Sequence, residues 1–127
     1  MHIKVETPSP YAKTVGYARA VRVENHIFVA GTASIAPDGT VYAPGNAYEQ
    51  AKKCLEIIEQ ALTELGARMD DVVRTRMFVK RRELWQEVGR AHGEFFSEIR
   101  PATSMLFCDL IDDEMLVEIE ADAVVAG

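Results

Sequence analysis

Cysteine is scarce in this chain, and so are long apolar runs, histidine and clustered positive charge. Cys54 falls in a helix-like pattern and Cys108 at the end of a strand-like one, which excludes a disulfide framework and predicts two buried thiols. No window is apolar over the length that crosses a bilayer, and "MHIKVETPSPYAK" lacks the apolar centre of a signal peptide. A cytoplasmic protein is therefore expected.

The distribution of charge and of catalytic residue types excludes further classes. The net charge is −6 and the arginines are dispersed, so a phosphate backbone would be repelled and nucleic acid is a poor candidate partner. His2, His26 and His92 lack the spacing of a metal-ligand set, and no metal site is expected. Neither Ser104 nor Cys108 has the sequence context of a covalent nucleophile.

What the chain does have is apolar content and regular periodicity. A chain of 127 residues with 48% hydrophobic residues suits one domain over residues 1–127. Two strand-like runs, 17–23 and 26–31, predict a hairpin, and a Gly/Pro-rich loop follows. Apolar residues then recur at helical spacing over 47–65, with Asn46 as the predicted N-cap and Gly66 at the C-terminal end.

The second half of the chain repeats this alternation of strands and helix. "DVVRTRMFVK" is strand-like, "ELWQEVGRAHGEFFSEI" is helical until Pro101 stops it, and strands follow at 103–110 and 115–125. The order β-β-α-β-α-β-β predicts an α+β, two-layer sandwich in which a mixed sheet carries two helices on one face.

The second face of that sheet is predicted to be charged. In "LVEIEADAVV" apolar and acidic residues alternate, which gives one core face and one acidic face. In "VVRTRMFV", Arg74 and Arg76 are expected to share a face with Val72 and Phe78. Two interpretations are open: a solvated face with ion pairs, or a face that meets other subunits.

Five stretches in order, "VGYARAVRVENHIFVAGT", the Gly/Pro loop, "DVVRTRMFV", "RPATSML" and "LVEIEADAVV", carry a resemblance. From about Thr14 to Val125 the chain resembles the Rid (YjgF/YER057c/UK114) family of reactive-intermediate deaminases. The resemblance implies a chorismate-mutase-like subunit in a homotrimer, with the sheets lining a central barrel and small-molecule pockets between subunits. It also implies hydrolysis of imines and enamines, such as 2-iminobutanoate, without metal or organic cofactor.

The resemblance implies the site residues as well. The family's "P-A-R-S" arginine anchors the substrate carboxylate, but this chain has Thr103 there, followed by Ser104 and Met105 at the predicted pocket border. It thus resembles a divergent member that lacks the carboxylate-binding arginine. Glu118 falls on the glutamate that positions or activates water, with an ion pair or interface role as the alternative. Tyr17 falls on a pocket tyrosine, with a half-buried strand aromatic as the alternative.

Other residues are candidates to complete this pocket. Arg19 is the preferred substitute for the missing arginine, because it should share the strand face of Tyr17. Arg100 is a second choice, expected in extended backbone because it precedes proline, and Arg76 is a third. Each arginine equally suits an ion pair with the acidic strand. The backbone of Gly31 and Thr32 is expected to border the pocket.

Three functions remain open. The first is a Rid-like hydrolase of a small imine, enamine or related carbonyl derivative, with Thr103 arguing against classical 2-iminoacid substrates. The second is a non-catalytic trimeric module that binds a metabolite or partner. The third is the ribonuclease or translation-inhibitor activity attributed to some relatives, which the net charge disfavours.

Overall fold

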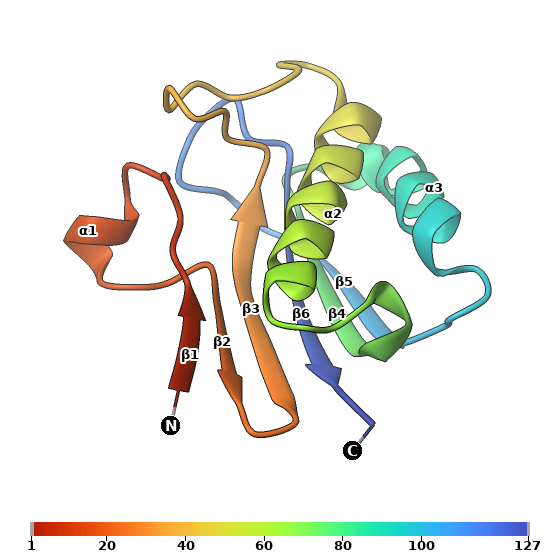
Figure 1. The fold of residues 1–127 in the computed structure, drawn as a ribbon. Coiled ribbons are helices and arrows are strands. Elements are labelled where there is room, and N and C mark those ends of the chain that lie inside the picture. Colours follow the sequence, from red (N-terminus) through yellow and green to blue (C-terminus); the bar gives the residue numbers. More distant parts are fainter. Residues whose placement is uncertain (1, 127) are drawn as a thin grey trace.

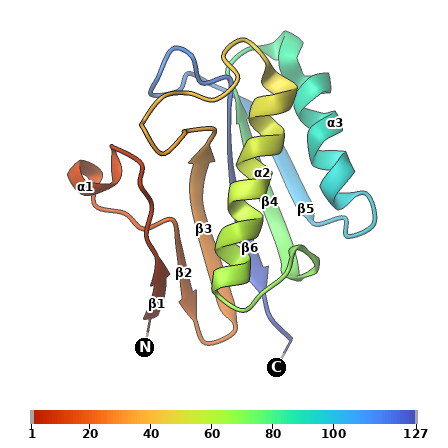
Figure 2. The same cartoon turned by 45° about the horizontal axis from the view of Figure 1, so that its top comes forward.

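Apolar alternation in the strands and apolar stripes on the helices fold the chain into two layers, a six-stranded mixed sheet with two long helices on one face (Figures 1 and 2). The computed structural model describes residues 2–126. Strand order is β1-β2-β3-β6-β4-β5, and β4 and β5 form the parallel pair. The predicted α+β class is confirmed. The elements are β1 (His2–Val5), α1 (Ala12–Val15), β2 (Ala20–Val23), β3 (His26–Ala33), α2 (Ala47–Glu64), β4 (Val72–Val79), α3 (Trp85–Phe96), β5 (Ala102–Phe107) and β6 (Val117–Val124), with 3₁₀ turns at Met69–Asp71 and Arg82–Leu84.

The boundaries differ from the sequence prediction in several places. β1 and α1 were not predicted, because four residues are too few to show a period. β2 begins at Ala20 rather than at residue 17, since the chain is still leaving α1 through Gly16, whose φ is +89°.

The end of α3 also differs. The helix stops at Phe96, before residue 99, and the Arg100 amide donates to the Phe96 carbonyl at 2.8 Å. The predicted extended backbone of Arg100 is wrong: its φ is +56°, in the left-handed region that closes a helical turn.

Helix α2 has the predicted caps. The Asn46 side chain accepts a hydrogen bond from the Glu49 amide at 3.0 Å, and Gly66 follows the helix with φ +79°. An N-cap of this type contributes about 1 kcal/mol to stability. The helix buries one face, which includes Leu55, Ile58 and Leu62, against the sheet.

The two faces of the sheet separate core from charge. On β6 the apolar residues of the alternating stretch are buried and the acidic ones are partly exposed, as predicted. On β4, Arg74, Arg76 and Phe78 share the open face, but Val72 lies on the buried face. The pairing with β6 is irregular between Val72 and Arg74, and this shift breaks the strict alternation on which the prediction for Val72 rested.

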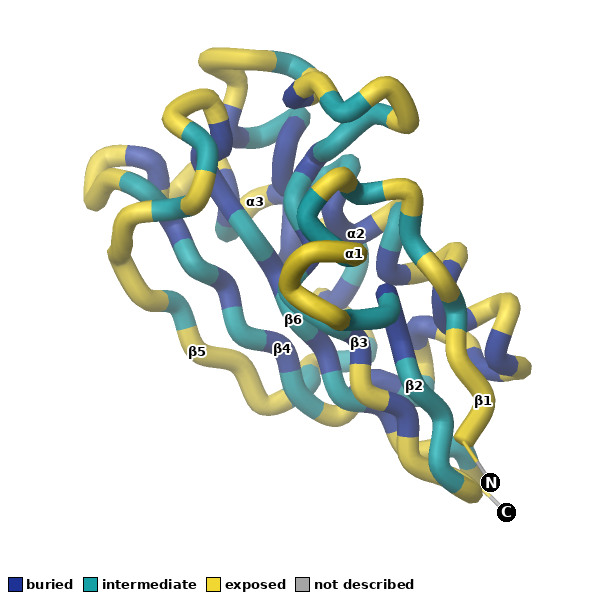
Figure 3. The backbone as a smooth tube through the Cα atoms, turned by 90° about the vertical axis from the view of Figure 1, so that its left-hand side faces the viewer, coloured by how far each residue is buried: buried dark blue, intermediate teal, exposed yellow. Residues whose placement is uncertain are grey.

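Ion pairs cross the open face between β4 and β6. Arg76 Nη1 lies 3.1 Å from Glu120 Oε1 and 3.5 Å from Asp122 Oδ2. These side chains are each about one third exposed, so the pairs fix side-chain positions more than they stabilise the fold. Residues along β4 and β6 alternate between buried and partly exposed, whereas β5, at the sheet edge, is exposed along most of its length (Figure 3).

Candidate functional site

A cleft of about 750 Å³ opens where the ends of β3 and β4 meet the start of β6. The segment around α1, the loop after β3, one face of α2 and the β5–β6 loop form its walls, at the opposite end of the sheet from both termini (Figure 1). Five residues that the sequence predicted for the site line this cleft: Tyr17, Arg19, Gly31, Thr32 and Glu118.

Glu118 and Gly31 lie in contact within the cleft. Glu118 projects from the open face of β6, where it is paired with Ala33 of β3 and Phe78 of β4. A Cβ on Gly31 would overlap Glu118 Oε2, so glycine is needed for this close approach. Burial raises the pKa of Glu118, and the neighbouring Arg19 guanidinium partly opposes that shift. The carboxylate therefore holds a proton more readily than an exposed one.

Arg19 is buried and bound to the main chain of β3. Its Nη1 donates to the Gly31 carbonyl at 2.8 Å, to Thr32 Oγ1 at 2.6 Å and, more weakly, to the Ala30 carbonyl at 3.4 Å. These oxygens lie at the irregularity in β3 between Val29 and Thr32. Burial lowers the pKa of Arg19, an ordinary consequence of desolvating a cation. Arg19 thus holds the bulge that presents Gly31 to the cleft.

Tyr17 lies on the segment before β2 rather than inside a strand. Its hydroxyl lies 3.1 Å from Ser9 Oγ, within hydrogen-bond distance, and its ring centroid lies 5.7 Å from Arg19 Cζ. The predicted proximity of Tyr17 and Arg19 is therefore present, through the turn that follows α1.

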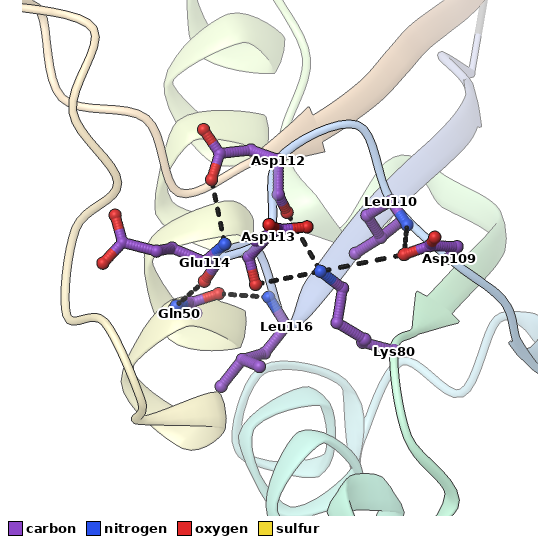
Figure 4. A network of polar contacts seen from close by, with 8 residues as sticks. All are labelled: Gln50, Lys80, Asp109, Leu110, Asp112, Asp113, Glu114 and Leu116. Carbon is purple, nitrogen blue, oxygen red and sulfur yellow. Dashed lines mark hydrogen bonds and ion pairs between the residues drawn. The ribbon is translucent and has the colours of Figure 1, made fainter.

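The β5–β6 loop, residues 108–116, forms one wall of the cleft and is held by Lys80 (Figure 4). Lys80 Nζ donates to the carbonyls of Asp112 at 3.1 Å and Asp113 at 2.9 Å. It also lies 3.8 Å from Asp109 Oδ1, and the Lys80 side chain is only 13% exposed. The loop is thus held mainly through its main chain.

Gln50 of α2 holds the other end of this loop. Its Nε2 donates to the Glu114 carbonyl at 3.0 Å and to the Ala43 carbonyl at 3.2 Å, and its Oε1 accepts from the Leu116 amide at 2.8 Å. Gln50 is fully buried (Figure 4 shows its contacts with the loop). One amide side chain therefore joins both loops that border the cleft.

The remaining predicted site residues lie elsewhere in the chain. Thr103, Ser104 and Met105 are on β5, and β4 and β6 separate this edge strand from β3. Arg100 is exposed before β5. Within one chain, Thr103 and Ser104 do not line the cleft that holds Tyr17 and Glu118, because β4 lies between β5 and β6. The prediction that they border a pocket formed between subunits stays a prediction. Arg76 forms the ion pairs described above.

Thr103 is nevertheless part of a hydrogen-bonded chain. Its Oγ1 lies 2.8 Å from Thr75 Oγ1 and donates to the Pro101 carbonyl at 3.0 Å. Thr75 Oγ1 lies 2.8 Å from Nε2 of His92, a buried residue of α3. Burial lowers the pKa of His92, which favours the neutral ring.

Sequence reasoning missed several cleft residues. Cys108 is exposed and lines the cleft, so the prediction of a buried thiol is wrong for it, whereas Cys54 is buried as predicted. The predicted strand 103–110 ends at Phe107, and Cys108 and Asp109 fall in the loop. Lys53 faces the cleft from the partly exposed side of α2. The acidic connector "IDDE" could have indicated that the loop between the last two strands lines the site, because loops between strands carry many functional residues.

Between residues 2 and 126, no group of three His, Cys, Asp or Glu side chains is placed to hold a metal ion. In the same part of the chain, no helix has the length and apolar character to cross a membrane.

Comparisons with known proteins agree with this architecture. A family model described as Endoribonuclease L-PSP matches residues 7–125. A Mycobacterium tuberculosis protein of the YjgF/YER057c/UK114 family is 40% identical, with a TM-score of 0.88 over 98% of this chain and 100% of that one. An uncharacterized Streptomyces coelicolor protein is 36% identical over 94% of this chain and 90% of its own length.

A further relative has an activity in its name. The mouse 2-iminobutanoate/2-iminopropanoate deaminase is 27% identical over 85% of this chain and 80% of its own length. The extent of these matches, together with the sheet order and the cleft, shows that the chain belongs to the Endoribonuclease L-PSP family, also named YjgF/YER057c/UK114 or Rid.

Proposed function

We propose that this protein is a cofactor-independent hydrolase of a small imine or enamine, and that Glu118 positions and activates the attacking water. The observation that carries the proposal is the Glu118 carboxylate, which faces the cleft against Gly31 and whose pKa is raised by burial. A raised pKa suits a group that must take up and return a proton near neutral pH.

The proposed reaction conserves atoms without an added redox partner. Water attacks the imine carbon while Glu118 accepts one of its protons, and a tetrahedral amino alcohol forms. Glu118 returns this proton to the nitrogen, the hydroxyl proton then moves to the nitrogen as the C–N bond breaks, and a carbonyl compound and ammonia leave. Tyr17, at the rim of the same cleft, is proposed to orient the substrate.

We further propose that the active form is a homotrimer and that the cleft is completed by β5 of a neighbouring copy. β5 is an exposed edge strand, and the open face of the sheet presents Phe28 and Leu106, each about half exposed. Exposed apolar side chains on one face of a sheet favour contact with another protein surface, here a second copy of the chain. This arrangement would bring Thr103 of one copy toward Glu118 of another.

A second candidate, a non-catalytic ligand-binding module, is favoured by one observation. Thr103 stands where the family pattern has a carboxylate-binding arginine, and a neutral hydroxyl does not replace a charge-assisted, two-pronged contact. Ribonuclease activity is disfavoured by the net charge of −6 and by the acidic row on β6.

Ammonia release from a panel of small imines, with and without a carboxylate, tests the proposal. Glu118→Gln should abolish turnover and leave the oligomeric mass unchanged. Asp122→Asn is the matched control, because Asp122 lies on the same face of β6 outside the cleft. Turnover retained in Glu118→Gln would disprove the catalytic role. Binding without turnover of any imine would support the non-catalytic module.

A further inference from the structure

The cations of the cleft are already engaged. Arg19 Nη1 donates to two carbonyls and one hydroxyl of β3, as described above. Lys53 Nζ lies 5.5 Å from the centroid of the Tyr42 ring, within cation–π range. A ligand carboxylate entering this cleft could use only the Nε and Nη2 groups of Arg19, and it would have to draw Lys53 away from the Tyr42 ring.

The carboxylates of the cleft are not equally engaged. Glu120 pairs with Arg76, and Asp109 lies near Lys80. Glu118 forms no ion pair or hydrogen bond within residues 2–126, although it faces the cleft. Because three carboxylates line the cleft against two cations that are partly engaged within the chain, its electrostatic preference is for neutral or cationic ligands with hydrogen-bond donors.

The chain from His92 to Pro101 fixes the direction of the Thr103 hydroxyl. The Pro101 carbonyl can only accept, so Thr103 gives it its single hydroxyl proton. Thr75 must then donate to Thr103, and His92 Nε2–H must donate to Thr75. This is the one order in which all three contacts are hydrogen bonds, and it leaves Thr103 Oγ1 with only acceptor capacity.

From these two sets of contacts we propose that the ligand of this cleft presents N–H donors and carries no carboxylate, as an amide, an amine or a carboxylate-free imine does. The Glu118 part of the inference depends on this chain alone. The Thr103 part rests on the proposed function, in which β5 of another copy borders the cleft. At this position the acceptor Thr103 Oγ1 replaces the arginine of the family pattern. The ligand group preferred there therefore changes from an anion to a hydrogen-bond donor.

Propanamide and propanoate provide a matched pair of probes, because they have the same size and differ in presenting NH₂ or a second carboxylate oxygen. Ligand-observed NMR on the purified protein should show propanamide binding about tenfold more tightly, the ratio expected when one buried hydrogen bond is lost. Equal or tighter binding of propanoate, or no measurable binding of propanamide, overturns the proposal. The measurement needs no turnover, so it is independent of whether the protein is a hydrolase.

Variants of Thr103 and His92 distinguish the contribution of Thr103 to ligand preference from that of Glu118. Thr103→Arg should reverse the preference toward propanoate, whereas Thr103→Ser, which keeps the hydroxyl, should leave it unchanged. His92→Gln tests His92 as a positioning residue, since it should reduce the amide-to-carboxylate ratio without abolishing binding. A ratio unaffected by Thr103→Arg would remove Thr103 from the site and leave the Glu118 part standing.

Lys53 supplies the competing explanation and its own control. If Lys53 leaves the Tyr42 ring to anchor an anion, propanoate should bind the wild-type protein well and Lys53→Met should abolish that binding. Such a result overturns the proposal. Weak propanoate binding in both the wild type and Lys53→Met supports it.

Discussion

Gly31 lies so close to the carboxylate of Glu118 that a side chain on residue 31 would overlap the carboxylate where it now lies. The clash is with the far end of a flexible side chain rather than with main chain, so an added methyl group would move Glu118 and not the sheet. Gly31 does not have a positive φ, and alanine fits its backbone without strain.

Gly31→Ala is therefore expected to lower imine hydrolysis at least about tenfold while changing the melting temperature by only a few degrees. Ammonia release and thermal unfolding check the two parts. Gly93→Ala is the control, because a Cβ at that helical glycine meets nothing within 4 Å. Unfolding of Gly31→Ala, or full activity in it, would contradict the prediction.

Glu118 should reduce stability at neutral pH. Its pKa in the folded protein is raised above the ordinary 4.5, so the native state binds the proton more tightly than the unfolded chain does. The free energy of unfolding therefore falls as the pH rises from 4.5 through the raised pKa. Glu118→Gln should therefore melt at a higher temperature than the wild type at pH 7, and the difference should shrink as pH falls toward 4.5. Lower stability of the variant at pH 7 would show that Arg19 stabilises the charge more than burial opposes it.

His92 should act in the opposite direction. Its pKa is lowered by burial from 6.5, so the unfolded chain takes up a proton that the folded protein resists. Stability should fall as pH decreases below 6.5, and His92→Gln should weaken this part of the pH dependence. The comparison uses unfolding free energies between pH 7.5 and 5.

The two cysteines should differ in reactivity. Cys108 is exposed in the cleft, whereas Cys54 is fully buried and burial strongly raises its pKa. A thiol reagent should label one cysteine per folded chain, mass mapping should place it at Cys108, and Cys108→Ser should abolish it. A bound cleft ligand should slow the labelling. Labelling of Cys54 without denaturant would contradict the structure.

The sequence predicted the fold class because its signals were long and periodic. Helix α2, with Asn46 and Gly66 at its ends, and the alternation on β6 required no tertiary information. Errors arose where tertiary contacts decide: Val72 changes face through an irregular register, and Arg100 adopts a positive φ after α3.

The candidate site was only partly predictable for a related reason. Family resemblance singled out Tyr17 and Glu118, and the end of a predicted strand indicated Gly31; the fold brings all three into one cleft. It did not reveal that Arg19 would be used by the main chain of β3, because alternation along a strand gives the face but not the hydrogen-bond partners. It also did not reveal that β4 lies between β5 and the strand that carries Glu118, since local periodicity does not determine strand order.

The way Lys80 holds the β5–β6 loop has a consequence for how this protein can change over evolution. Its closest contacts are to the carbonyl oxygens of Asp112 and Asp113, atoms that every amino acid possesses. Leu110 and Ile111, which line the cleft from the same loop, can therefore be exchanged for other side chains without losing the anchor. Single substitutions of Leu110 or Ile111 can therefore change the ligand specificity while the main chain of the loop keeps its shape.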